Sequence, residues 1–150
     1  MATEPRIFLD TSAIFAGIWS PDGGGRMILK LGEASALKLI TSRDVLGELE
    51  RVFRRKAPEL LGEITIIMDR SRLEIGPSPK KRDVENNLML VGHPGDASII
   101  TAARSMDVDF FVTLDRKHFI QNKRLVKEVS FPIGTPGDML EWYRRELNNN

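Results

Sequence analysis

The feature of this chain that most constrains its fold is an alternation of short apolar runs with longer amphipathic segments. Short apolar runs bounded by turn residues are typical of buried strands, and apolar residues at helical spacing are typical of helices. The predicted strands cover residues 6–9, 37–41, 72–76, 109–115 and 124–131. Strands that alternate with helices predict an α/β layered domain around a mainly parallel sheet.

Helical periodicity follows the first strand and recurs in six later segments: 27–35, 42–56, 59–71, 84–90, 93–107 and 135–147. The segment 42–56 has the clearest signals, because Ser42 is a suitable N-cap, an acid stands in the first turn and basic residues stand in the last. The glycine-rich segment 20–27 predicts an open loop. The asparagine tail, 148–150, is expected to fray.

Composition excludes several classes of function. The chain has no cysteine, so disulfides, thiol catalysis and cysteine-based zinc sites are ruled out. A net charge of +1 gives no overall footprint for nucleic acid, although the 22 Lys and Arg residues can gather on one face. The length of 150 residues fits one domain, 1–150, with a single core. No segment has the roughly 18 apolar residues of a membrane span, and we expect a soluble cytoplasmic protein without a membrane partner.

Four carboxylates occupy positions where a ligand site is expected. In parallel sheets, ligand sites form beyond the carboxyl ends of the strands. Asp10 and Asp115 come directly after apolar runs, at the ends of predicted strands. Glu48 and Asp96 lie early in helices that follow a strand or a turn. All four positions map to one edge of the proposed sheet.

Each of these acids has an ordinary structural explanation when it is considered alone. Asp10 and Asp96 are typical of helix N-caps. Asp115 fits a loop acid paired with one of the basic residues that follow it, and Glu48 fits a solvated helix acid. Periodicity places Asp96 at the top of an apolar helix face. It does not choose between Glu48 and Glu50, because these residues flank opposite edges of one apolar stripe.

Acids gathered at one site favour a bound cation. Several neighbouring carboxylates do not all stay ionised without one. Hard oxygen ligands suit Mg²⁺ or Mn²⁺, which keep several waters and meet a substrate phosphate. One or two such ions would orient a water, lower its pKa and stabilise the transition state of phosphodiester hydrolysis. From the residues alone, helix capping and metal binding both remain open.

Four segments resemble, in order, the sequence blocks of the PIN domain family. They are RIFLDTSAIFAGI, ITSRDVLGELERVF, GDASIITAARSMDVDFFVTLDRKHF and FPIGTPGDMLEW, and together they span nearly the whole chain. The family comprises metal-dependent nucleases, including the ribonuclease toxins of VapBC-type toxin–antitoxin pairs. The resemblance therefore implies a three-layer α/β/α fold and hydrolysis of single-stranded RNA.

Position by position, the acids of the family match Asp10, Glu48, Asp96 and Asp115, and the hydroxyl residue before the fourth acid matches Thr113. The match favours Glu48 over Glu50. By resemblance, the first three acids hold one Mg²⁺ or Mn²⁺, and the fourth helps to hold a second ion or orients the water. Hydrogen bonds to a carboxylate, a metal-bound water or a phosphate oxygen are expected from three hydroxyl residues: Thr11, Ser12 and Thr113.

Basic and aromatic residues near these positions are candidates for RNA contacts. Arg116 and Lys117 follow the fourth acid at the expected edge of the site and are the better basic candidates. The basic last turn of 42–56 is explained more simply by the helix macrodipole. Phe15 and Trp19 are able to stack a base, but we expect them to pack in the core.

Two classes of function fit these residues. The first is a ribonuclease, the toxin of a toxin–antitoxin pair, for which the resemblance implies an antitoxin partner and a homodimer. The second is a catalytically weak PIN-like module that binds RNA or a protein partner. A phosphatase of the haloacid dehalogenase type needs an Asp where this chain has Ser12. His93 and His118 stand in separate blocks and are expected at the surface, which disfavours a histidine metal site.

Overall fold

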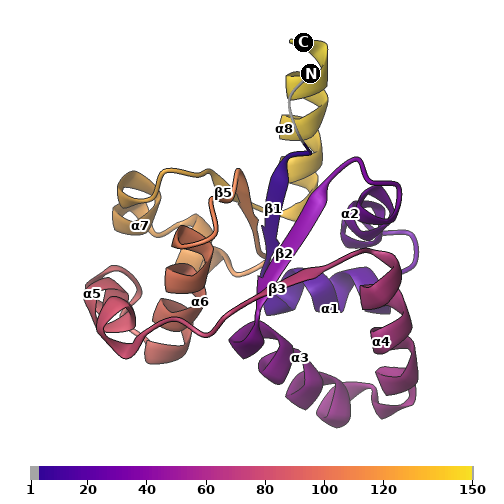
Figure 1. Cartoon of the computed structure of the whole chain (residues 1–150), viewed down its shortest axis with the longest axis horizontal. Helices are drawn as coiled ribbons and strands as arrows, with labels where there is room; N and C mark the ends of the chain where they lie inside the picture. The colour runs from indigo at the N-terminus through magenta and orange to yellow at the C-terminus, as the bar shows by residue number, and fades with distance from the viewer. Residues whose placement is uncertain (1–3, 150) are drawn as a thin grey trace.

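The computed structural model describes residues 4–149 and has a central parallel sheet with helices on both sides (Figure 1). The strands are β1 (Arg6–Leu9), β2 (Lys38–Ser42), β3 (Glu74–Gly76), β4 (Phe110–Val112) and β5 (Ile133–Gly134), and their spatial order is β3-β2-β1-β4-β5. Every neighbouring pair is parallel. The predicted three-layer α/β/α fold around a mainly parallel sheet is confirmed.

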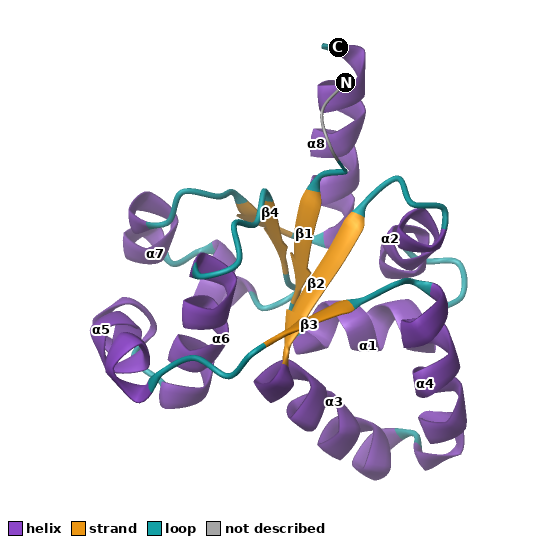
Figure 2. Cartoon of the chain, viewed as in Figure 1, coloured by secondary structure: helices purple, strands orange, loops and turns teal. Residues whose placement is uncertain are grey.

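Helices occupy most of the connections between the strands (Figure 2). They are α1 (Thr11–Trp19), α2 (Gly24–Glu33), α3 (Arg43–Lys56), α4 (Leu61–Arg70), α5 (Lys81–Val91), α6 (Pro94–Arg104), α7 (Lys123–Glu128) and α8 (Pro136–Asn148), with a short 3-10 helix, η1 (Pro58–Leu60), and a short π-helix, η2 (Arg116–Ile120). In Figure 1, α1 and α2 lie on one side of the sheet and α5, α6 and α7 on the other. Within residues 4–149, no helix is long and apolar enough to span a membrane.

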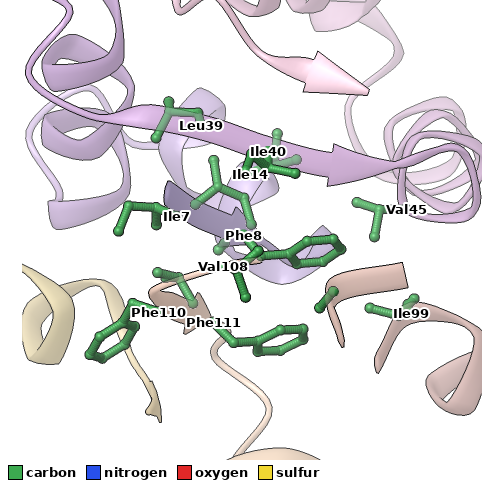
Figure 3. Close-up of a cluster of buried hydrophobic side chains, with 14 of the residues drawn as sticks. Ile7, Phe8, Ile14, Leu39, Ile40, Val45, Ile99, Val108, Phe110 and Phe111 are labelled. Atoms are coloured by element: carbon green, nitrogen blue, oxygen red, sulfur yellow. The ribbon is translucent and has the colours of Figure 1, made fainter. Parts of the chain in front are cut away.

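The core lies along the central strands (Figure 3). The rings of Phe8 in β1 and Phe111 in β4 are register partners and stack with centroids 5.2 Å apart and planes inclined by 6°. Leu39 and Ile40 of β2 are fully buried beside them. Strands covered by helices on both faces carry near-continuous apolar runs instead of alternating ones. This property made β1, β2 and β4 recognisable in the sequence.

The chain order opens a crevice at the carboxyl ends of β1 and β4. From β1 the chain continues to β2 and β3 on one side, and β4 and β5 then add to the other side of β1. Ligand sites of open parallel sheets form at such a reversal of strand order. The backbone N–H of Asp10 donates to the Val112 carbonyl at 3.0 Å, and that of Thr113 donates to the Gly134 carbonyl at 2.9 Å. Both residues are thereby fixed at the edge of the sheet.

The predicted final strand at 124–131 is wrong. Residues 123–128 form α7, and the last strand, β5, contains two residues, Ile133 and Gly134. Leu125 and Val129 are both buried and stand four residues apart, which is helical spacing. The Asn122 side chain caps the helix by accepting from the Leu125 backbone N–H at 3.1 Å. A capped helical turn with one buried edge therefore forms where a buried strand was expected.

The predicted open loop at 20–27 is also wrong over its second half, because α2 begins at Gly24. Gly25 is buried where α2 meets α1. A Cβ atom on Gly25 would lie 2.8 Å from the Gly17 backbone nitrogen, closer than atoms can pack. The missing side chain allows two helix backbones to touch, whereas the sequence rule associates clustered glycines with flexibility.

The other predicted elements match observed ones to within about three residues at each end, the usual uncertainty of element boundaries. Helix α5 begins at Lys81, three residues before the predicted start of this helix at residue 84. Helix α8 extends to Asn148, the first residue of the tail that was expected to fray, and Asn150 lies outside the described residues.

The helix contact at Gly25 predicts opposite effects for two glycine substitutions. Gly25→Ala is expected to lower the free energy of unfolding by about 1–3 kcal/mol, because the new methyl group meets the backbone of α1. Gly62→Ala in α4 has no atom within 4 Å of the new methyl group and is expected to raise it by about 0.5–1 kcal/mol. Urea denaturation measures both values. Stabilisation by both substitutions would contradict the close contact.

Candidate functional site

A pocket of about 310 Å³ opens at the sheet edge where β1 and β4 end. It is lined by the four acids that were predicted from the sequence: Asp10, Glu48, Asp96 and Asp115. Asp10 follows the end of β1, and Glu48 lies in the first half of α3. Asp96 lies in the first turn of α6, and Asp115 directly precedes η2. Residues separated by more than a hundred positions thus share one concave surface.

Asp10 is the most deeply buried of the four acids, with 5% of its surface exposed. The Thr113 hydroxyl donates to Asp10 Oδ2 at 2.7 Å. Ser12 Oγ lies 3.4 Å from the same oxygen and 3.3 Å from Thr113 Oγ1. Asp10 occupies the N-cap position of α1, but its side chain makes no capping hydrogen bond. The explanation of Asp10 as a side-chain cap is therefore wrong.

The two hydroxyl groups also tie the loop after β4 to the start of α1. Ser12 Oγ accepts from the Leu114 backbone N–H, and Thr113 Oγ1 accepts from the Asp115 backbone N–H, both at 3.0 Å. Each hydroxyl accepts from one backbone N–H and points its proton toward the cluster around Asp10. Thr11 also lines the pocket, and its Oγ1 is buried without a hydrogen-bond partner among residues 4–149.

Helix α6 presents Asp96 to the pocket without using it as a cap. The N-cap is His93, whose Nδ1 accepts from the Gly95 backbone N–H at 3.1 Å. The alternative that Asp96 caps this helix is therefore wrong. Its neighbours Ile99 and Ile100 are buried, as the apolar stripe of the sequence indicated. Asp96 stands at the end of that stripe and is half-buried.

Helix α3 carries Glu48 into the pocket and Glu50 away from it. Ser42 caps α3 by accepting from the Val45 backbone N–H at 3.3 Å, as predicted. Glu48 lines the pocket but is an exposed residue. Glu50 pairs with Arg54 at 2.6 Å on the protein surface. The apolar stripe of the helix could not distinguish Glu48 from Glu50. Their positions in the structure do, because only Glu48 lines the pocket.

Asp115 organises the turn that closes the pocket. Its Oδ1 accepts from the His118 backbone N–H at 3.0 Å, and its Oδ2 lies 2.9 Å from His118 Nδ1. Its partner is thus His118, and the alternative pairing with Arg116 or Lys117 is wrong. Both basic residues are exposed and neither lines the pocket. Among the described residues that line it, Lys56 alone is basic.

A sequence model of the PIN domain matches residues 6–117. The chain belongs to the PIN domain family. Members of this family are generally nucleases that use divalent metal ions. No curated protein sequence matches the chain significantly.

Solved structures share the fold of this PIN domain at low sequence identity. PAE2754 from Pyrobaculum aerophilum is 14% identical with a TM-score of 0.64, over 94% of this chain and 90% of that one. VapBC2 from Rickettsia felis, solved with a DNA fragment from its promoter, is 20% identical with a TM-score of 0.63, over 86% of this chain and 98% of that one. VapC20 from Mycobacterium tuberculosis, a sarcin–ricin loop cleaving toxin, is 15% identical with a TM-score of 0.56, over 77% of this chain and 94% of that one.

The electrostatics of this PIN domain pocket oppose full ionisation of its acids. Burial raises the pKa of Asp10 to about 6; the Thr113 hydrogen bond opposes this rise, and the charges of Glu48 and Asp96 add to it. Burial also raises the pKa of Asp96, where His118 and His93 act in the opposite direction. A cation in the pocket would remove this repulsion.

The donor set fits a hard divalent cation. Carboxylate oxygens are the ligands that Mg²⁺ and Mn²⁺ prefer, and four carboxylates line the pocket. Over residues 4–149, no three Asp, Glu or His side chains converge closely enough to hold one ion. The acids surround a common pocket without meeting at one point, as expected of like charges.

Sequence reasoning missed two features of the pocket. Trp19 was expected in the core but is 53% exposed, and Phe15 is half-buried and lines the pocket. The pairing of His118 with Asp115 was also missed. Its signal was available, because an Asp followed three residues later by a His reaches it across one helical turn.

The raised pKa of Asp10 predicts a pH-dependent gain in stability for Asp10→Asn when metal is removed with EDTA. The folded state holds the Asp10 proton more tightly than the unfolded state does. Protonated Asp10 therefore contributes to the free energy of unfolding below about pH 4, and this contribution is lost as pH rises through 6. Asparagine has no proton to lose. The free energy of unfolding of the variant, relative to that of the wild type, should therefore grow by about 3 kcal/mol between pH 4 and pH 7.5.

Urea denaturation at the two pH values measures this change, and Asp22→Asn at an exposed position is the matched control. An Asp10→Asn advantage that stays constant between the two pH values would contradict the raised pKa.

Proposed function

We propose that this PIN domain is a metal-dependent endoribonuclease that hydrolyses phosphodiesters of single-stranded RNA, with residues 1–150 acting as a single nuclease domain. The observation that carries the proposal is that four carboxylates line one pocket at the carboxyl ends of β1 and β4. The raised pKa of buried Asp10 supports it, because strongly perturbed acids in a cleft are concentrated at functional sites.

In this proposal Asp10, Glu48 and Asp96 hold one Mg²⁺ or Mn²⁺, and Asp115 helps to hold a second ion or orients the attacking water. The ion would supply Lewis-acid stabilisation of phosphate charge and a water of lowered pKa. Residues of this chain would position the carboxylates and bind the RNA.

Three hydroxyl residues have separate tasks in the proposed mechanism. Thr113 fixes the Asp10 carboxylate through its 2.7 Å hydrogen bond, and Ser12 braces Thr113. Thr11 also lines the pocket, and we assign its hydroxyl, which is buried and has no partner among residues 4–149, to a hydrogen bond with a water or a phosphate oxygen of the substrate. Arg116 and Lys117 are exposed beside Asp115 and would attract the RNA backbone.

We further propose that the chain is the toxin of a toxin–antitoxin pair, that it forms a homodimer and that it works in the cytoplasm with a cognate antitoxin. Two structural relatives support this assignment. VapBC2 was solved bound to DNA from its promoter, and VapC20 is a sarcin–ricin loop cleaving toxin. An antitoxin would have to cover the carboxylate pocket or prevent RNA from entering it.

A catalytically weak PIN module that binds RNA or a protein partner is the second candidate. One observation favours it: the acids around the pocket do not converge on a single point within residues 4–149. Only an activity measurement distinguishes a site that assembles around metal from one that has lost hydrolysis.

The nuclease proposal predicts cleavage of single-stranded RNA with Mg²⁺ or Mn²⁺. Asp10→Asn, Asp96→Asn and Glu48→Gln should each lower kcat/KM by about 100-fold or more, because each removes a carboxylate proposed to hold the ion that stabilises the negative charge of the transition state. Glu50→Gln is the matched control, since Glu50 lies on the same helix outside the pocket. RNA cleavage that needs no metal, or that survives all three substitutions, would remove the basis of the proposal.

Metal binding can be measured without activity. Saturating Mn²⁺ should raise the Tm of the wild type, since a ligand at 100 times its Kd stabilises a protein by about 2.7 kcal/mol. Asp96→Asn should lose most of this rise and Glu50→Gln should retain it. A rise in wild-type Tm without RNA cleavage would favour the weak binding module, and no rise in Tm would contradict a metal site.

A further inference from the structure

An aromatic pair leads away from the carboxylate pocket along α1. Phe15 and Trp19 are four residues apart, so their side chains lie on the same face of the helix. Their rings stack with centroids 5.9 Å apart and planes inclined by 11°. Phe15 lines the pocket, whereas 53% of Trp19 is exposed to solvent. One end of the stack therefore belongs to the pocket and the other faces outward.

The inner ring of this pair is held by the core. Phe15 packs against the buried ring of Phe53 in α3, with centroids 4.7 Å apart. Val52, one residue before Phe53, also lines the pocket. The orientation of the Phe15 ring, and of the Trp19 ring stacked on it, is therefore set before any ligand arrives, so little conformational entropy is lost when a flat ligand stacks on the exposed side of Trp19.

A cation lies beside the same ring. Lys56 Nζ is 5.9 Å from the centroid of Phe15, at the outer limit of a cation–π contact. Lys56 is exposed, and it makes no ion pair with any acid in the described part of the chain. Its ammonium group is available for a phosphate at the mouth of an otherwise acidic pocket.

The spacing along α1 suits a short stretch of single strand. At a rise of about 1.5 Å per residue, Phe15 lies roughly 7 Å and Trp19 roughly 13 Å along the helix from Asp10. Stacked nucleotides are about 3.4 Å apart, so these distances correspond to roughly two to four nucleotides. A strand with one phosphodiester at the acids can therefore reach the aromatic pair.

We infer that Phe15, Trp19 and Lys56 form a subsite for an unpaired RNA base: the base stacks on the aromatic pair, and Lys56 contacts a phosphate of the same segment. The inference rests on the proposed nuclease function and specifies what that function recognises beside the bond to be cut. Stacking accepts every base, because every base has a π-face. The subsite thus selects unpaired RNA over duplex without selecting a sequence.

The position of the pair favours RNA over a protein partner. An exposed Trp also suits a protein interface, but this Trp continues a ring that lines the carboxylate pocket. The adjacent free lysine matches the charge of a phosphate. A nucleic-acid strand uses the pocket, the rings and the lysine together.

Binding can be measured at Trp19 itself. The chain has two tryptophans, and Trp142 packs against Phe110 away from the pocket. In a Trp142→Phe background, saturable quenching of the Trp19 fluorescence is expected with oligouridylate and oligoadenylate, in EDTA and in Ca²⁺. An abasic strand and an RNA duplex should give no quenching. Equal quenching by the abasic strand would overturn the inference.

Affinity for labelled oligouridylate, measured by anisotropy, then tests each contact. Trp19→Leu should weaken binding by about 5- to 150-fold, the usual range for loss of one stacked base, and Trp19→Tyr should restore most of it. Lys56→Gln should reduce the slope of log affinity against log salt by about 0.7. Ile66→Ala, at a residue of α4 that is also 53% exposed, is the matched control and should leave binding unchanged.

Cleavage kinetics separate the failure of this inference from the failure of the nuclease proposal. Trp19→Leu should raise KM with little change in kcat. A wild type that cuts RNA and a Trp19→Leu variant with unchanged affinity and KM would overturn the subsite and leave the nuclease standing. Quenching and weakened binding without any cleavage would support the subsite and reject the nuclease. A Trp19→Leu variant that changes only the oligomeric state would identify a protein interface and overturn the subsite.

Discussion

The hydrogen bond from Thr113 to Asp10 is the contact on which the pocket depends. It joins the residues that directly follow β1 and β4, the two strands between which the order of the sheet reverses. Pairing of Leu9 with Val112 brings the two residues side by side, so the bond follows from the register of the sheet. Thr113 also accepts from the Asp115 backbone. One hydroxyl thereby positions the first and the fourth acid.

This arrangement has a cost in stability that a bound cation would offset. A carboxylate as buried as Asp10 would be stabilised best by a basic partner, yet the groups facing it are hydroxyls and other acids. Strain of this kind is usual where a protein keeps a site ready for a ligand. The surrounding core tolerates it, because the central strands are buried on both faces and Phe8 stacks on Phe111. Core and site thus share the same two strands.

Sequence reasoning succeeded where a local pattern determines the outcome. β1, β2 and β4 are continuous apolar runs, and Ser42 caps α3 as its position indicated. It failed where a contact between residues far apart in the sequence determines the local structure. β5 is two residues long and owes its existence to pairing with β4, not to its own sequence. Gly25 lies in a helix because Gly17 is opposite it, a contact that no local rule contains.

The acids show the same division. Asp10 and Asp115 were recognisable because a parallel sheet directs residues after its strands to one edge. Glu48 and Glu50 were not separable by periodicity, because both flank the stripe that buries α3. Their difference depends on where α3 lies relative to the sheet, which is a property of the tertiary structure.

Helix α1 explains why the aromatic pair was assigned to the core. Ile14 and Ile18 are buried, while Phe15 and Trp19 each stand one position further along the chain. One position rotates a side chain by about 100° around the helix. Two apolar stripes with identical spacing therefore run along α1, one buried in the core and one leading from the pocket to the solvent-exposed surface. Hydrophobicity gives both stripes the same pattern, so only the elements packed against each face distinguish a core contact from a binding surface.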